Sequence, residues 1–470
     1  MLHAAHCEAM QHTVANDAWT GRTRLTAVSL GFAAALTNFD VTSVVVVLPS
    51  IGTTLGIRVA QWAWIIDAYS IAFTATLLVA GAIADRFGKR HTLLAGNIGF
   101  LVASLACGLA RNSPLFLIAR AAQGAAAAFL VTGGFASIAT AFPAAESRAR
   151  AFGVAGMASG VAMALGPSLG GVIGAGLGWR WIFLFNLPLC MLIALMVPRL
   201  VAEERDNTDK PLDWLGIALL TVALALLIET ILEAHDAPVP LAFGLGTGVG
   251  LAALFAIRQR RQPRPMLDPA VFASRPMMGV TALLFAVSVG YWAVLVYLPL
   301  FLSIAFGWTA ETAGLAMLVA TLPMLAMPPL AGSLVPRLGW RRLFTMALAL
   351  IALGGAALAL SSLVEATSAR ACALAGMALI GMGAALSHPQ LSGAVIALAP
   401  PEASGMASAL TVIARQAGFA LGVAVLGALT ASRLDVTGFA WPFGVAAAAA
   451  TIGVLACLLL PPSSSARNRP

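Results

Sequence analysis

Long apolar runs joined by short charged turns are the feature that most restricts how this chain can fold. Residues 62–83 carry one formal charge, Asp67, and residues 92–110 carry none, whereas the turn Gly81–His91 that joins them holds five ionisable side chains. An apolar run of about 20 residues spans a bilayer as a helix, and a charged turn cannot lie in hydrocarbon. The pattern therefore predicts an all-α polytopic membrane protein with this turn at a membrane surface.

The composition supports this class of protein. Hydrophobic residues make up 60% of the 470 residues, and the mean hydropathy is +0.92. A soluble chain of this length could not bury so much apolar surface. The net charge of +8 would suit a nucleic-acid partner, but the basic residues are spread over many short turns. This dispersal favours membrane orientation and argues against nucleic-acid binding.

Fourteen apolar runs have membrane-spanning length. If the amino terminus is cytoplasmic, 20 of the 27 Lys and Arg residues fall in cytoplasmic segments, five at outer loops and two within spans. Short cytoplasmic loops are normally the basic ones, so both termini are expected in the cytoplasm. The predicted spans are residues 25–51, 61–83, 92–110, 114–141, 151–177, 180–198, 213–233, 239–257, 277–303, 312–335, 343–363, 370–398, 403–430 and 438–460.

The second part of the chain repeats the first. Leu298-Pro299 repeats Leu48-Pro49 after 250 residues, and residues 405–408 repeat the Gly-Met-Ala-Ser of residues 156–159. In the charged turns, the repeated residues are Gly81, Arg86, Gly88 and Arg90, followed 251 residues later by Gly332, Arg337, Gly339 and Arg341. Secondary transporters are commonly built from two such parallel bundles.

The repeat assigns twelve spans to two six-helix bundles and leaves two spans as an insertion between them. Charged residues on both sides of the inserted pair indicate solvated cytoplasmic linkers. The expected segments are a cytoplasmic tail at 1–24, the first bundle at 25–198, linkers with two inserted helices at 199–276, the second bundle at 277–460 and a cytoplasmic tail at 461–470.

Charged residues inside apolar runs are candidates for proton coupling. Asp40 lies within the first span, and an intramembrane acid is costly enough to indicate a function. Arg120 lies in the fourth span, one helical turn before Gln123, and its charge demands an acidic or carbonyl partner. Asp67, in the second span, is a third candidate and is expected near a hydrated outer edge. The alternative for Asp40 is a structural carboxylate bonded to a neighbouring side chain.

Small residues in the fifth span are expected to permit close helix packing and a hinge; they are Gly166, Pro167, Gly170 and Gly171. In the second half, Arg415 stands at the repeat position of this hinge. It would either line a central cavity or pin its helix to a neighbour. Further cavity candidates are Gln123, Tyr69, Trp292, Tyr297 and His388, although the aromatic rings would also suit a membrane interface and the histidine a structural hydrogen bond.

Several motifs resemble those of known transporters. The pattern G-x-x-x-D-R-x-G-K-R at residues 81–90 resembles the loop between spans two and three of the major facilitator superfamily. Its members Gly81, Asp85, Arg86, Gly88, Lys89 and Arg90 would form a conformational loop. Three more motifs resemble the fourteen-span drug:proton antiporter branch (EmrB/QacA-like): Asp40-x-Thr…Leu-Pro49, Arg120-x-x-Gln-Gly124 and Gly166-Pro-x-x-Gly-Gly171.

This resemblance implies the major facilitator fold and a secondary active transporter. The implied activity is proton-coupled antiport that exports amphipathic or cationic drugs, or related small molecules, by alternating access. Asp40, Arg120 and Asp67 would then couple protons. No cofactor is implied, since the proton gradient supplies the energy. The implied location is a bacterial cytoplasmic (inner) membrane, with a small-molecule substrate and lipid as partners and accessory export proteins left open.

Other classes of protein are weaker alternatives. A dedicated exporter of one metabolite or antibiotic would carry the same motifs. A proton-pumping subunit would place lysines in mid-membrane, but both lysines, Lys89 and Lys210, lie in loops. An enzyme or metal protein would need clustered ligands, and no catalytic or metal site is expected. The one close set, His3, His6, Cys7 and His12, fits a polar tail better.

Overall fold

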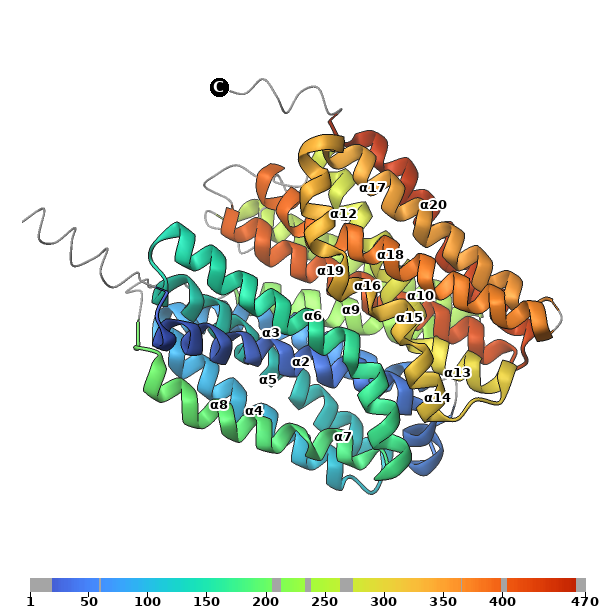
Figure 1. Ribbon diagram of the computed structural model, residues 1–470, viewed down its shortest axis with the longest axis horizontal. Helices are drawn as coiled ribbons and strands as arrows, with labels where there is room; N and C mark the ends of the chain where they lie inside the picture. The colour runs from blue at the N-terminus through green and yellow to red at the C-terminus, as the bar shows by residue number, and fades with distance from the viewer. Residues whose placement is uncertain are drawn as a thin grey trace, which may run out of the picture.

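The computed structural model describes residues 19–58, 61–204, 213–232, 238–262, 274–364, 366–398 and 404–461. The secondary structure of these residues is helical, without strands (Figure 1). Twelve of the described helices are long and apolar enough to cross a membrane, and two apolar helices, Ala63–Leu77 and Ala310–Ala326, are shorter. The predicted all-α membrane protein is thus confirmed, while the count of fourteen spans stays a prediction.

The first half packs around α2, which lies in the middle of this half in Figure 1 and contacts α3, α5, α6, α7 and α8. Helix starts follow local capping chemistry: the Asn112 side chain accepts a hydrogen bond from the Leu115 backbone N–H at 3.0 Å. The helices are α2 (Gly21–Thr54), α3 (Ala63–Phe87), α4 (Lys89–Leu109), α5 (Ser113–Ala141), α6 (Ala145–Gly176), α7 (Arg180–Leu184) and α8 (Asn186–Leu200).

Two helices, α9 (Trp214–Leu232) and α10 (Pro238–Arg261), separate this half from the second. The second half begins with one long helical segment in three parts, α12 (Arg275–Val287), the π-helix η2 (Ser288–Ala293) and α13 (Val294–Phe306). It continues with α14 (Ala310–Ala316), α15 (Leu318–Thr321), α16 (Pro323–Ala326), α17 (Pro328–Ser361), α18 (Ala366–Leu398), α19 (Ser404–Ser432), η4 (Thr437–Phe439), α20 (Ala440–Ala456) and η5 (Cys457–Leu459).

The segment predicted as one helix over 312–335 is broken. It is divided among α14, α15, α16 and the start of α17. Proline lacks a backbone N–H and clashes with the preceding turn, so a helix is interrupted where it occurs. Pro323 and Pro328 stand at the beginnings of α16 and α17. The expectation of an unbroken helix is therefore wrong.

Backbone conformation reproduces the internal repeat. Gly88 and Gly339, which correspond in the two charged turns, both have positive φ, at 108° and 74°. Gly56 and Gly307 are also 251 residues apart and have nearly equal φ, at 65° and 66°. Residues with a side chain rarely adopt this region, so glycine is needed at each position. The predicted tight turn at Gly88 is confirmed, and its counterpart separates two helical stretches of α17.

Packing between the halves is reciprocal, as a parallel repeat would require. In the first half, α6 packs against α2 and reaches across to α14, α15 and α16. In the second half, α19 packs against α12 and η2 and reaches across to α3 (Figure 1). α6 and α19 therefore play equivalent parts: each belongs to one half and packs against helices of the other half. The inserted helix α9 lies at this seam, because it contacts both α3 and α19.

Small residues bring α6 and α14 together. A Cβ atom at Gly171 would lie 2.5 Å from the Ala310 carbonyl oxygen and 3.2 Å from the Gly314 Cα atom. The Ser168 hydroxyl donates to the Gly314 carbonyl at 2.8 Å. Such an approach needs interfaces without side-chain bulk. In the structure, Gly171 of the fifth span lies at a close helix crossing, and its role in a hinge stays a prediction.

A polar cluster joins the start of α9 to the end of α10. The Asp213 carboxylate accepts hydrogen bonds from Arg258 at 2.9 Å, from Gln259 at 2.8 Å and from the Gly216 backbone at 2.9 Å. Burial raises the pKa of Asp213, but these hydrogen bonds outweigh it, so the pKa lies below its ordinary value. Glu229, farther along α9, is exposed.

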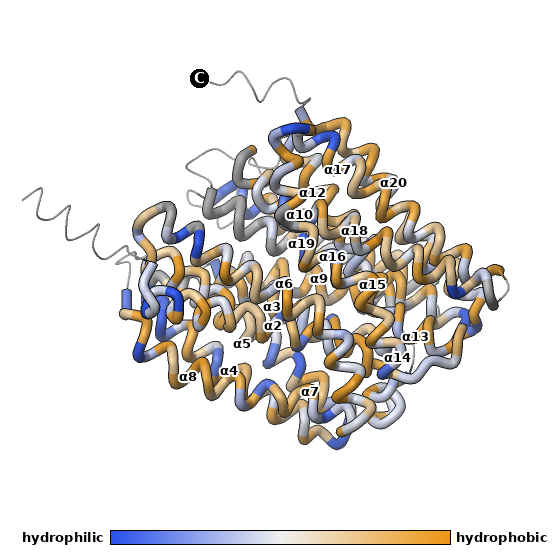
Figure 2. Tube along the Cα trace, viewed as in Figure 1, coloured by the Kyte–Doolittle hydropathy of each residue, from blue (hydrophilic) through white to orange (hydrophobic). Residues whose placement is uncertain are grey.

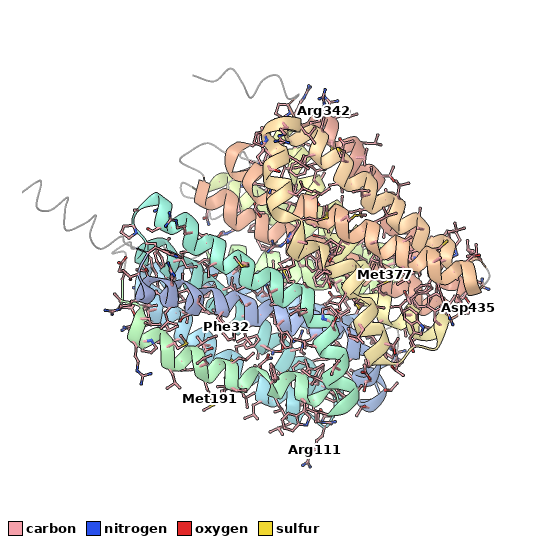
Figure 3. The ribbon with its side chains drawn as sticks, in the orientation of Figure 1. Phe32, Arg111, Met191, Arg342, Met377 and Asp435 are labelled. Carbon is pink, nitrogen blue, oxygen red and sulfur yellow. The ribbon has the colours of Figure 1, made fainter. Side chains whose placement is uncertain are left out.

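The distribution of polarity fits a membrane. Hydrophobic residues follow the long helices, and hydrophilic residues gather at the turns (Figure 2). Arg342 and Asp435 mark opposite ends of the second half, with Met377 between them (Figure 3). Large apolar side chains are exposed on the outer helices, among them Ile98, Phe243 and Trp441. Apolar surface of this kind is stable against lipid and unstable against water.

The α6–α14 crossing generates the first prediction. We expect Gly171→Ala to destabilise the protein by about 1–3 kcal/mol, the usual cost of overpacking. Gly153→Ala on the same helix is the matched control, because a Cβ there would meet nothing within 4 Å, and alanine favours a helix over glycine. Thermal melting of both purified variants in detergent measures the difference. Equal melting temperatures would contradict a tight crossing.

Candidate functional site

An ion pair lies at the centre of the first half. The Arg120 Nη1 atom of α5 donates to the Asp40 Oδ2 atom of α2 at 2.8 Å, and neither side chain has exposed surface. Both residues were predicted from sequence as charges inside apolar spans, and the structure brings them into direct contact. Burying two charges costs several kcal/mol for each ion unless partners surround them. The neighbouring residues therefore decide what this pair can do.

Two amides complete the shell of Asp40. Its Oδ1 atom accepts hydrogen bonds from Gln123 Nε2 at 2.9 Å and from Asn186 Nδ2 at 2.7 Å. Gln123 also donates to the Ser104 hydroxyl at 2.8 Å. Helices α2, α4, α5 and α8 thus share one buried hydrogen-bond network. Every hydrogen bond to the Asp40 carboxylate comes from a donor, and Oδ2, which accepts only one, keeps an acceptor position where a proton could bind.

Protein groups also surround the guanidinium of Arg120. Its Nε atom donates to the Ile65 carbonyl at 3.1 Å, and its Nη1 atom donates to Gln123 Oε1 at 2.6 Å. The guanidinium carbon lies 4.7 Å from the centre of the Tyr69 ring and 5.7 Å from that of Phe183. Aromatic faces attract cations, most strongly away from water. The buried Nη2 atom has no hydrogen-bond partner among the described residues.

Asn186 and Ser104 were missed by the sequence analysis. Each is a lone polar residue inside or beside an apolar run, and Asn186 begins α8 directly after the Trp179–Phe185 stretch. Both side chains are fully buried. A lone amide or hydroxyl in a membrane helix usually indicates a hydrogen bond to another helix. That signal was available, but it does not identify the partner.

Asp67 occupies a different environment from the one expected. Its side chain is fully buried, and neither carboxylate oxygen has a hydrogen-bond partner among the described residues. It lies within electrostatic reach of Tyr297 from the second half, whose hydroxyl donates to the Val423 carbonyl at 2.8 Å. The expected hydrated outer edge is therefore wrong: Asp67 is enclosed where the two halves meet.

The conformational loop is bound to the segment that follows α8. Arg90 donates to the Val201 carbonyl at 3.1 Å and lies 3.4 Å from the Glu203 carboxylate. His91 contacts the same carboxylate through its side chain and through its backbone N–H. Glu203 is a partner that the loop motif alone did not indicate. Gly81 lies in α3, and Arg86 lies exposed beside the Phe87 ring; the side chain of Asp85 is outside the described part.

A small cavity, lined mainly by apolar side chains, lies between the halves. Its lining comes from α2, α6, η2, α13 and α19 and the junction of α14 and α15: Val41, Thr42, Val45, Pro167, Trp292, Leu295, Val296, Met317 and Phe419. Of the predicted cavity residues, Trp292 lines it, and His388 meets the Trp292 ring at 5.4 Å. Tyr69 and Gln123 belong instead to the buried ion-pair network, and Tyr297 is buried between α13 and α19.

The described residues contain no group of three or more His, Cys, Asp or Glu side chains that could hold a metal ion. The set of His3, His6, Cys7 and His12 considered in the sequence lies outside the described residues. The buried polar centre of the molecule is therefore built from an ion pair and amides, a chemistry suited to proton binding and conformational change.

The buried pair generates the second prediction. We expect Asp40→Asn and Arg120→Gln each to destabilise the protein by about 3–5 kcal/mol, because each leaves one buried charge unbalanced. The double variant should lose much less than the sum, since it removes both charges. Melting of the four proteins in detergent gives the coupling energy.

A second pair provides the matched control. Arg433 and Asp435 also lie 2.8 Å apart, but both are exposed. Exposed pairs contribute about 0–1 kcal/mol, so the cycle of Arg433→Gln and Asp435→Asn should be nearly additive. Near-additive behaviour at the buried pair would contradict its central role in stability.

Known proteins resemble most of this chain. Residues 30–423 match the family model described as Major Facilitator Superfamily. Multidrug resistance protein Stp of Mycobacterium tuberculosis (strain CDC 1551 / Oshkosh) is 30% identical over 416 residues, which cover 88% of this chain and 77% of that protein. The Methylenomycin A resistance protein of Streptomyces coelicolor (strain ATCC BAA-471 / A3(2) / M145) is 30% identical over 439 residues, or 92% and 89% of the two chains. Puromycin resistance protein pur8 of Streptomyces alboniger is 33% identical over 399 residues, or 83% and 78%.

Solved structures share the fold at low identity. A crystal structure of peptide transporter POT in complex with sulfate has a TM-score of 0.68 and 16% identity, covering 92% of this chain and 93% of that chain. At 16% identity, this similarity is evidence for the fold only. Together with the family model and the relatives, it leads to one conclusion: the chain belongs to the Major Facilitator Superfamily of membrane transporters.

Proposed function

We propose that this transporter exports amphipathic small molecules in exchange for protons, across a bacterial cytoplasmic membrane with both termini inside. The observation that carries the proposal is the fully buried pair of Asp40 and Arg120. Relatives named for resistance to drugs and antibiotics support the export of such compounds. The energy comes from the proton gradient, and no cofactor takes part.

Proton binding would act through the network around Asp40. A proton on the carboxylate removes the counter-charge of Arg120 and weakens the hydrogen bond between the two side chains. Arg120 would then rely on Gln123, the Ile65 carbonyl and the Tyr69 face, and its unpaired Nη2 atom would be free to take a new acceptor. Because α2, α4, α5 and α8 share the network, this exchange of partners would shift the helices against one another.

Alternating access would use the seam between the halves. The halves are in close contact at the α6–α14 crossing, and Asp67 of α3 is fully buried. Release of this crossing would open the seam and hydrate Asp67, which makes it a second proton-binding candidate. We count α3 and the broken segment α14–α16 among the spans, which gives fourteen, arranged as two six-helix bundles with α9 and α10 inserted.

Efflux tests the coupling role of Asp40. Cells that express the protein are loaded with anionic, neutral and cationic dyes and antibiotics while de-energised, and export is followed after energy is restored. We expect Asp40→Asn to reduce protonophore-sensitive export at least about ten-fold, because the loss of a proton-transferring side chain slows the step it serves by this factor or more. Asp435→Asn, an exposed acid at the far end of the second half (Figure 3), should keep the parental rate.

Equal export by Asp40→Asn and the parent, at equal membrane expression, would reject the proposed coupling. The same panel distinguishes a dedicated exporter of one metabolite or antibiotic. Export of a single compound would support that second candidate.

A further inference from the structure

Arg415 is a positive charge in the second half without a carboxylate partner among the described residues. It lies in the middle part of α19, and its side chain is half-buried. Within the described residues no carboxylate pairs with its guanidinium, and its backbone carbonyl is the group that accepts from Ser288, at 3.0 Å. Charges inside membranes normally have partners or functions.

The surroundings of Arg415 contain a histidine and a tryptophan whose N–H group has no acceptor among the described residues. His388 of α18 lies within its electrostatic reach and meets the Trp292 ring edge-on at 5.4 Å. The Trp292 indole N–H is buried without an acceptor. It is held by η2, where the adjacent Tyr291 hydroxyl donates to the Ala320 carbonyl at 3.1 Å. π-Helices of this kind are frequent at functional sites.

These groups adjoin the cavity between the halves. Phe419 lies four residues after Arg415 on α19, so the two side chains share one helix face. Phe419 and Trp292 both line the cavity, and the rest of its lining is almost entirely apolar. The arrangement is therefore a small apolar cavity with a cation, an imidazole ring and an indole N–H donor beside one wall.

Negative charges are not available to this cavity. Asp40 is fully buried and engaged by three donors, and Asp67 is fully buried in α3. No acidic residue lines the cavity in the described part of the chain. A cationic ligand would meet no counter-charge here, and it would be repelled by Arg415. A carboxylate would satisfy the charge and accept the free hydrogen bonds.

We propose that Arg415, His388 and Trp292 receive the acidic end of an amphipathic substrate, whose apolar body lies against the cavity walls of α2, α6, η2 and α19 once the two halves have moved apart to widen this space. This inference rests on the proposed function and refines its substrate class. The sequence favoured amphipathic or cationic compounds, whereas the geometry selects amphipathic carboxylates. Arg415 supplies the charge, and Trp292 supplies a directed hydrogen bond from a rigid ring.

Equilibrium binding to the purified full-length protein tests this site without a proton gradient. The probes are dansyl-leucine, its uncharged methyl ester and the cation dansylcadaverine, each followed by fluorescence polarisation. We expect the carboxylate to bind the parent about ten-fold more tightly than the other two, the contribution of a hydrogen-bonded charge. Arg415→Gln should remove this preference and leave methyl-ester binding unchanged, and Arg415→Lys should retain part of it.

Two further variants make the result specific. Arg370→Gln changes an exposed arginine of α18 and should preserve the ten-fold preference. Trp292→Phe keeps the ring contact with His388 but loses the donor, so it should weaken dansyl-leucine binding by about three-fold and spare the ester. Equal binding of the three probes by the parent, or an unchanged preference in Arg415→Gln, would overturn the inference.

The two proposals fail in different experiments. Selective carboxylate binding without proton-driven export would reject the coupling role of Asp40 and keep the anion site. Proton-driven export of cations or esters, with no carboxylate preference in binding, would reject the anion site and keep the coupling.

Discussion

The pairing of Asp40 with Arg120 is the constraint on which the first half of this protein depends. Two full charges without exposed surface are stable only if the groups around them replace water. Here that replacement comes from Gln123, Asn186 and the Ile65 carbonyl, which belong to three different helices. The position of each helix is therefore fixed in part by the group that it contributes to the ion pair. A change in the charge of Asp40 or Arg120 would alter the interactions of all these helices at once, and such a link is physically required if a proton is to be coupled to a movement.

The second half repeats the backbone arrangement of the first half but carries different polar side chains. Corresponding glycines have similar φ values in both halves, and α6 and α19 make reciprocal exchanges across the seam. The polar content is not repeated. The first half encloses a balanced ion pair, whereas Arg415 of the second half has no carboxylate partner among the described residues and shares a helix face with Phe419, which lines the cavity. We interpret this difference as a division of labour, with proton coupling in one half and substrate recognition in the other.

Much of the fold and part of the site were predictable from sequence. Apolar runs and charged turns predicted the helices because hydrocarbon admits few alternatives. Gly88 and Gly339 were predicted as equivalent because the turns that contain them repeat. Asp40 and Arg120 were singled out because an unpaired charge in a membrane is costly. Asp67 was misjudged, since depth along a helix does not reveal whether a neighbouring half covers it.

Residue type and spacing by themselves determined that this chain crosses a membrane, that its halves repeat and that two buried charges need partners. Only the tertiary structure decided which atoms satisfy them. Asn186 donates a hydrogen bond to Asp40, which is 146 residues away along the chain. Tyr69, which was expected to line a cavity, instead packs its ring against the Arg120 guanidinium. Such contacts depend on the rotation of each helix about its axis and on the helices it meets. Those quantities are set by packing among many side chains at once, and no local pattern of residues records them.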